Sequence, residues 1–356
     1  MEVKEWSSPY NSFNSMKGLM YIREYEGIAK DKFLPPIEAS IAPFGNCNLN
    51  CEWCNSRAVL NKKPQMLEIK RLKRLVKDWL KWGVKGFCFA GTGEPSMYPP
   101  LMGIMEYIKD NGGETSIITN GTMINEHLQF FLPRNCKWIG ISMDAGTATT
   151  YAKVKRTSPE MFNRLVNNVR TMVKLNRDCQ ISLKFLFHPD NCHEIYRACK
   201  LAKDIGVVDF HIRPFSTGFE GVEEKHFSQK QIESINRQIA KCFKLEDENF
   251  RVYGVRHKFA PDFGVANNFN RCLASPLLLI AESDGYAYLC LEFRGIKKYR
   301  LCKLEDVRKF WGSKKHLDII KKINPKRDCL ARCTMTAYNS QIENCVIEDK
   351  MCRRFP

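Results

Sequence analysis

Short apolar segments alternate with longer amphipathic ones from Pro36 to Val208, and this alternation is the feature that most limits the fold. Runs of β-branched and apolar residues predict strands, and apolar residues at every third or fourth position predict helices. The strand pattern occurs at 37–42, 84–91, 114–121, 137–145, 180–189 and 207–215. The helix pattern occurs at 67–83, 100–113, 125–134, 158–176 and 192–206. Repeated strand–helix alternation predicts right-handed βαβ units and a parallel sheet.

The number of units and the change of pattern after Phe215 define the expected architecture. About six units are too few for a closed eight-fold barrel, so we expect an α/β fold, a partial (β/α)6 TIM-like barrel. Ligands of such sheets bind at the carboxyl ends of the strands. Beyond the barrel, 227–245 predicts a helix, 249–255 a strand, and Ser283-Asp284-Gly285 a hairpin turn. The predicted division is an N-terminal extension (1–35), a barrel core (36–220), a connecting helical segment (221–270) and a cysteine-rich module (271–356).

Cysteine usage indicates metal or redox chemistry. The first 30 residues carry charges throughout, and no apolar run approaches the roughly 18 residues of a membrane span. We therefore expect a cytoplasmic protein with no membrane partner. The chain has 16 cysteines, and thiols in a reducing compartment more often bind metals than form disulfides. Six scattered cysteines are interpreted as small buried hydrophobic residues: Cys88, Cys136, Cys179, Cys192, Cys199 and Cys242.

The net charge of +17 indicates an anionic partner. The candidates are a phosphorylated substrate or a nucleic acid such as tRNA. The alternative is a lysine-rich solvated surface, and the chain has no recognised nucleic-acid motif. Nucleic acid is therefore not the favoured partner.

Three thiols follow the first predicted strand in the spacing C-x3-C-x2-C, at Cys47, Cys51 and Cys54. A structural zinc site requires four ligands, and no Cys or His follows within 30 residues of Cys54. Three ligands suit a 4Fe–4S cluster in which one iron is left to bind a small molecule. Trp53 would supply apolar cover for such a cluster.

This motif, at the end of the first strand of a partial barrel, resembles that of the radical S-adenosylmethionine (radical SAM) superfamily. The resemblance implies that the open iron binds S-adenosylmethionine, whose reductive cleavage gives a 5′-deoxyadenosyl radical that abstracts hydrogen from substrate. The segment "GTGEP" after the second strand resembles the family's Gly-Gly-Glu-Pro motif, which binds the methionine amino group. The cofactor-binding residues implied here are Gly91, Thr92, Gly93 and Glu94. At later strand ends the resemblance implies Thr119 and Ser142, then Asp144, and it suggests Lys184 and Arg213 for cofactor or substrate contact.

The C-terminal cysteines resemble the SPASM and twitch modules of the same superfamily. Cys272, Gly285 and Cys290 match the opening hairpin, 304–324 supplies a helix, and Cys329 and Cys333 form the following pair. The resemblance implies one auxiliary 4Fe–4S cluster on these four cysteines, with zinc as the alternative. The count also allows a second cluster that uses Cys302, Cys345 and Cys352, although their spacing does not match the family pattern.

The resemblance implies an oxidoreductase that abstracts hydrogen from a carbohydrate-like or nucleotide-linked small molecule and uses the auxiliary cluster as electron acceptor. Its expected partners are an anionic or sugar-like substrate and a reductant such as flavodoxin or ferredoxin. The alternatives are a peptide-modifying enzyme, a tRNA-modifying enzyme and a non-enzymatic Fe–S or zinc protein. Only 46 residues precede Cys47, so we expect no fused leader-peptide domain of about 80 residues, as in peptide-modifying relatives.

Overall fold

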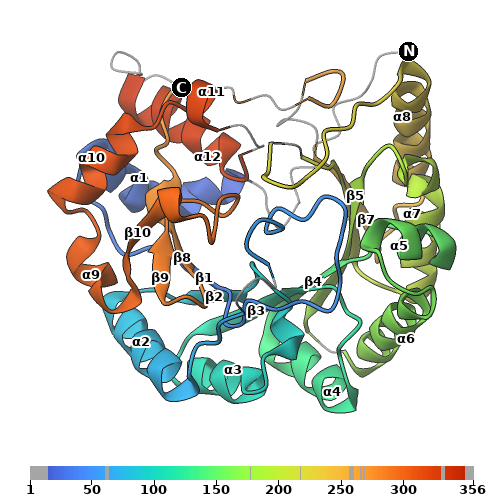
Figure 1. Cartoon of the computed structure of the whole chain (residues 1–356), viewed down its shortest axis with the longest axis horizontal. Helices are drawn as coiled ribbons and strands as arrows, with labels where there is room; N and C mark the ends of the chain where they lie inside the picture. Colours follow the sequence, from blue (N-terminus) through green and yellow to red (C-terminus); the bar gives the residue numbers. More distant parts are fainter. Residues whose placement is uncertain are drawn as a thin grey trace.

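A computed structural model describes residues 15–60, 64–176, 178–216, 218–255, 260–264, 267, 269–329 and 333–348. Its strands form one curved sheet with helices on the outer face (Figure 1). The strands are β1 (Glu38–Ile41), β2 (Gly86–Phe89), β3 (Glu114–Thr119), β4 (Cys136–Ser142), β5 (Gln180–Phe187), β6 (Asp209–Pro214), β7 (Arg251–Gly254), β8 (Leu278–Ala281), β9 (Tyr286–Tyr288) and β10 (Arg300–Lys303). The helices are α1 (Ile22–Ala29), α2 (Ile69–Trp82), α3 (Leu101–Asp110), α4 (Glu126–Asn135), α5 (Ala148–Lys155), α6 (Glu160–Leu175), α7 (Ile195–Ile205), α8 (Gln229–Phe243), α9 (Val307–Phe310), α10 (Lys314–Lys322), α11 (Pro325–Asp328) and α12 (Thr336–Gln341).

The sheet order is β10-β9-β8-β1-β2-β3-β4-β5-β6-β7. The strands from β1 to β7 are parallel and adjacent in chain order, which confirms the predicted partial α/β barrel. Strand β7 extends the parallel sheet by one strand beyond the expected six. The hairpin strand β8 pairs in parallel with β1, so the cysteine-rich part of the chain continues the same sheet. The sheet therefore crosses both of the domain boundaries expected near 220 and 270.

Helix α2 shows how local sequence sets these elements. Its buried residues follow helical spacing: Leu72, Leu75, Val76, Trp79 and Leu80. The Glu68 carboxylate caps the first turn by accepting hydrogen bonds from the backbone N–H groups of Lys70 and Arg71, each at 2.8 Å. Gly83, with φ of 126°, ends the helix as predicted, because few other residues adopt this backbone conformation.

The predicted helix over 304–324 is wrong as one element. It consists of a short 3-10 turn, α9 and α10, with a break around Gly312. Gly312 has φ of 73°, and the Ser313 hydroxyl accepts a hydrogen bond from the backbone N–H of His316 at 3.3 Å to cap α10. The amphipathic pattern continues across a chain reversal that the Gly-Ser pair makes.

The two faces of the curved sheet differ in chemistry. Outward residues such as Ile41 and Phe89 pack under the helices in the main hydrophobic core. The alternate positions of the same strands carry small or polar residues, including Ser40, Cys88 and Ser116, which are also buried. The interior is thus polar rather than filled with branched apolar side chains, unlike that of a closed barrel. Among the described residues, no helix is long and apolar enough to cross a membrane.

Candidate functional site

The three closely spaced thiols lie in the loop that follows β1, and all three are partly buried. Burial raises the pKa of Cys47 to about 12 and the pKa of Cys54 to about 11. Their neighbouring thiols add to the rise, which places the three sulfur atoms within electrostatic reach of one another. The Asn120 side-chain nitrogen lies 3.9 Å from Cys47 Sγ. Three grouped thiols fit a cluster in which one iron has no protein ligand.

The end of α5 holds this cysteine loop in place. The backbone N–H of Asn50 donates to the carbonyl of Lys155 at 3.2 Å, and that of Glu52 donates to the carbonyl of Val154 at 3.1 Å. Trp53 is buried against Val154. These contacts fix the backbone on both sides of Cys51.

The GTGEP segment meets the cysteine loop at the carboxyl ends of β2 and β3. The backbone N–H of Glu94 donates to the carbonyl of Asn46 at 2.7 Å. A Cβ atom at Gly93 would lie 2.1 Å from the carbonyl oxygen of Phe44, so only glycine allows this approach. The buried Glu94 carboxylate accepts hydrogen bonds from Thr119 Oγ1 at 2.5 Å and from the Asn120 N–H at 2.8 Å. Thr119 is therefore joined to the motif, as its position predicts.

The first half of the motif contacts the C-terminal module. Gly91 has φ of 133° and packs against the Arg294 guanidinium. Thr92 is buried, and its hydroxyl oxygen lies 3.4 Å from that of Ser56, two residues beyond Cys54. All four predicted motif residues thus lie beside the cysteine loop or the module.

The remaining predicted site residues lie in other parts of the barrel. Ser142 ends β4 and is the register partner of Lys184 in β5. The Lys184 ammonium lies 4.9 Å from the centre of the Trp138 ring, toward the interior of the sheet. Arg213 is half-buried in β6. Asp144 is buried and forms an ion pair with the buried Lys155, which ends α5. The contacts of Lys184 with β4 give it no visible tie to the cysteines, and the roles of Ser142, Lys184 and Arg213 remain predictions.

The four predicted auxiliary cysteines line a single enclosed cavity. They are Cys272, Cys290, Cys329 and Cys333. Apolar side chains form much of the remaining wall: Phe269, Leu289, Phe293, Tyr299 and Ile323. Burial raises the pKa of Cys329 to about 11 and also raises that of Cys272, and the Cys333 thiol adds to both shifts. Four grouped thiols in an apolar pocket fit an Fe–S cluster or a zinc ion.

The other C-terminal cysteines do not share this cavity. Cys302 lies in β10, and Cys345 is exposed in the helical turn Ile342–Glu348. Neither lines the cavity in the part of the chain that the structure describes. Cys352 lies outside the described residues.

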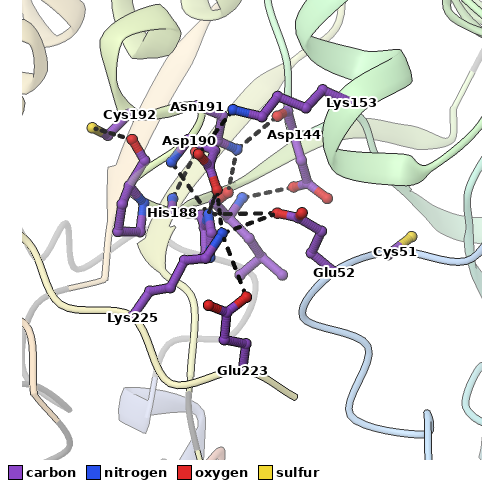
Figure 2. Close-up of polar contacts among 12 residues, drawn as sticks. Cys51, Glu52, Asp144, Lys153, His188, Asp190, Asn191, Cys192, Glu223 and Lys225 are labelled. Atoms are coloured by element: carbon purple, nitrogen blue, oxygen red, sulfur yellow. Dashed lines mark hydrogen bonds and ion pairs between the residues drawn. The ribbon is translucent and has the colours of Figure 1, made fainter. Parts of the chain in front are cut away.

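Sequence reasoning missed an ion-pair network beside Cys51 (Figure 2). Lys225 Nζ lies 2.7 Å from Asp190 Oδ2 and 3.9 Å from Glu52 Oε2. Lys153 Nζ binds the other Asp190 oxygen at 2.9 Å, and His188 Nδ1 lies 3.2 Å from Asp190 Oδ2. Glu52, His188 and Asp190 have the spacing of a metal site, but the ammonium of Lys225 already occupies the cation position among the carboxylates. We interpret the network as a clamp on the cysteine loop.

His188 also packs against the aromatic cover of the cysteine loop. Its ring lies 5.0 Å from Trp53 and 4.5 Å from Phe215. Burial lowers the pKa of His188 to about 4, so the ring is neutral at neutral pH. The position of His188 one residue after β5 was the available sequence signal, since strand ends carry functional groups in this fold.

Comparisons with known proteins agree with this geometry. The model of the radical SAM superfamily matches residues 41–229. An S-adenosylmethionine-dependent nucleotide dehydratase from Thermoplasmatales archaeon (strain ISO4-H5) is 23% identical over 287 residues, which cover 77% of this chain and 93% of the relative. A probable GTP 3′,8-cyclase from Saccharolobus islandicus is 22% identical over 232 residues, covering 62% of this chain and 71% of that protein.

Solved structures share the fold. The crystal structure of SuiB from Streptococcus suis has a TM-score of 0.67 and 15% identity, and covers 90% of this chain and 77% of its own. A second SuiB structure, bound to S-adenosylmethionine, has a TM-score of 0.63 and 16% identity, and covers 84% of this chain and 71% of its own. At these identities the likeness shows the fold alone.

Proposed function

The chain belongs to the radical SAM superfamily, and on that premise we propose that it is an oxidoreductase that abstracts hydrogen from a nucleotide-linked or carbohydrate-like small molecule. Members of this superfamily are enzymes that bind a 4Fe–4S cluster and S-adenosylmethionine. The bound pair supplies a 5′-deoxyadenosyl radical when the cluster is reduced. The alternative of a non-enzymatic Fe–S or zinc protein is therefore excluded.

The observation that carries the proposal is the meeting of the cysteine loop with the GTGEP segment. We assign Cys47, Cys51 and Cys54 as cluster ligands, because their thiols group at the carboxyl end of β1. The loop and the motif are joined directly by the hydrogen bond from the Glu94 N–H to the Asn46 carbonyl. The buried Trp53 excludes water from one side of the loop.

The cavity of Cys272, Cys290, Cys329 and Cys333 supports an auxiliary 4Fe–4S cluster. Its apolar wall would exclude water from the cluster and tune its reduction potential. A closed four-thiol site suits electron transfer better than substrate ligation, because the thiols leave no coordination position open. We therefore assign the auxiliary site the role of accepting an electron from the oxidised substrate.

A nucleotide-linked substrate is supported by similarity and by charge. The relative named a nucleotide dehydratase matches most of both chains, and the probable cyclase carries a nucleotide in its name. The net charge of +17 favours an anionic ligand. The similarity to SuiB, which has also been solved with its precursor peptide SuiA, is one of fold and does not favour a peptide over a nucleotide.

Anaerobic reconstitution tests the two cluster assignments separately. We expect about eight iron atoms per chain, four for each cluster, and about four after Cys272→Ala with Cys290→Ala. Loss of 5′-deoxyadenosine formation is expected for Cys51→Ala, and its retention would overturn the catalytic assignment. Four irons in the unchanged protein, with zinc on the remaining thiols, would overturn the auxiliary cluster.

Substrate class is tested with the reconstituted enzyme and a reductant. Substrate-dependent 5′-deoxyadenosine release is measured with nucleoside triphosphates, nucleotide sugars, unmodified tRNA and short peptides. We expect release to rise with one of the first two classes. A rise with tRNA or peptides alone would replace the small-molecule proposal by one of its alternatives.

A further inference from the structure

A buried arginine joins the auxiliary cysteine segment to the cofactor-binding motif. Arg294 is four residues beyond Cys290, and its side chain is 4% exposed. Its guanidinium enters the barrel and donates from Nη1 to the carbonyl of Ala90 at 2.6 Å and from Nη2 to Ser40 Oγ at 3.1 Å. These bonds fix the ends of β1 and β2, which precede the cysteine loop and the GTGEP motif.

The same guanidinium lies against the first glycine of the motif. A Cβ atom at Gly91 would lie 1.7 Å from Arg294 Nη1 and 2.9 Å from the Cβ of Ala42. The positive φ of Gly91 is equally unsuitable for other residues. Gly91 and Arg294 are therefore fitted to each other, and neither can move without displacing the other.

A second chain of contacts explains the threonine of GTGEP, where the family motif has glycine. Glu282, directly after β8, is 2% exposed, and its Oε1 lies 3.2 Å from Arg294 Nη1. The Glu282 carboxylate also forms a hydrogen bond with the side chain of Thr92. The Thr92 hydroxyl in turn lies 3.4 Å from Ser56 Oγ. Polar contacts thus run from the auxiliary module through Thr92 to the loop that carries Cys54.

We propose that Arg294, with Glu282, is a positioning residue through which the auxiliary module holds the S-adenosylmethionine-binding motif in its binding conformation. The inference rests on the proposed function, because it takes GTGEP as the cofactor motif and the four-thiol cavity as a cluster site. The planar fork of an arginine can hold a carbonyl, a hydroxyl and a carboxylate at once, which a lysine cannot. Loss of either partner leaves the other as an uncompensated buried charge. Occupation of the auxiliary site and affinity for S-adenosylmethionine are then coupled, and such coupling is reciprocal.

The first test compares Arg294→Gln with Arg300→Gln. Arg300 belongs to the same module and pairs with Asp284 at 2.5 Å, but makes no contact with the motif among the described residues. We expect Arg294→Gln to raise the dissociation constant of S-adenosylmethionine about tenfold, measured by equilibrium dialysis of the reconstituted protein, and Arg300→Gln to leave it unchanged. An unchanged constant in Arg294→Gln overturns the proposal, as does an equal rise in both variants.

A double-mutant cycle tests the coupling itself. Cys290→Ala, which disrupts the auxiliary site, is expected to weaken S-adenosylmethionine binding in the unchanged background and to have little further effect beside Arg294→Gln. Additive effects would overturn the coupling. If Arg294→Gln does not fold, Arg294→Lys replaces it in the cycle, because it keeps the charge and loses the fork. Glu282→Gln in the presence and absence of Thr92→Gly tests the threonine link in the same way.

Iron counts separate this inference from the proposed function. A protein with about four irons in every variant lacks the auxiliary cluster, and the proposed function then fails in that part. The dialysis measurement still reports whether Arg294 positions the motif. A full iron content together with an unchanged dissociation constant in Arg294→Gln overturns the positioning role alone.

Discussion

At the scale of single residues, strand-end position was the most informative sequence signal. The cysteine loop follows β1, GTGEP follows β2 and Thr119 ends β3, so parallel order predicted that they would meet. The hydrogen bond from Thr119 to Glu94 agrees with that expectation. His188 obeys the same rule, but its partners come from three other segments, and no local pattern indicates which charges a fold will bring together.

The buried ion pair of Asp144 and Lys155 gives a prediction at this scale. Asp144 adopts φ of 55°, a conformation that asparagine also tolerates, so Asp144→Asn mainly removes the charge. Both side chains are at least 97% buried, and the unpaired Lys155 ammonium is expected to destabilise the protein by about 3–5 kcal/mol. Urea denaturation of the apo-protein measures this loss.

The matched control is the exposed pair of Lys137 and Glu114, whose nitrogen and oxygen lie 3.5 Å apart. Glu114→Gln should cost at most about 1 kcal/mol, because water screens the charges. Equal losses in the two variants would show that Asp144 stabilises the fold through its shape and not through its charge.

At the scale of elements, helices and strands were predictable where one apolar period ran between clear stop signals. Helix α2 ends at Gly83 as expected. The segment 304–324 shows the limit, since its apolar positions match one helix although Gly312 turns the chain between two. A glycine inside a helical pattern does not by itself state whether it interrupts the helix.

The segment after β6 gives a prediction about how elements hold the cysteine loop. Val222 packs against Trp53 on one side and beside Phe293 on the other, and Lys225 bridges Asp190 and Glu52. Lys225→Ala leaves two carboxylates facing each other without their cation, so the loop should open more often. We expect faster iron loss from the reconstituted protein in excess chelator, followed by the decay of visible absorbance.

Lys230→Ala is the control for this measurement, because Lys230 is exposed on α8 outside the clamp. Its iron loss should match that of the unchanged protein. If Lys225→Ala retains iron equally well, the network does not clamp the loop and serves only the surface.

At the scale of the whole molecule, the fold class was predictable but the attachment of the cysteine-rich module was not. Alternation along the chain specifies parallel neighbours, which accounts for β1 to β7. The pairing of β8 with β1 joins residues more than 200 positions apart. Such a pairing depends on which sheet edge the folded barrel leaves open, and the sequence of β8 alone predicts only a strand. Arg294 could insert beside Gly91 only because of this pairing.

Charge is the whole-molecule property that gives the last prediction. Exposed Lys and Arg residues number four on α2 and eleven in 297–327, against two exposed acidic residues in the same segments. The segments are neighbours, since Arg308 in α9 pairs with Asp78 in α2 at 2.7 Å (Figure 1). We call this surface the basic face. Its charge density predicts salt-dependent binding of polyanions, driven by counterion release.

Charge reversal can separate the basic face from the net charge. Lys309, Lys315 and Lys322, all exposed on this face, are changed together to Glu, and the control changes the exposed Lys200, Lys230 and Lys244 near or on α7 and α8. Both triple variants carry the same net charge. We expect only the first to elute from heparin at clearly lower salt and to bind unmodified tRNA more weakly, because the phosphate or sulfate groups contact the basic face. Equal shifts in the two variants would mean that net charge, and not the arrangement of α2, α9 and α10, determines polyanion binding.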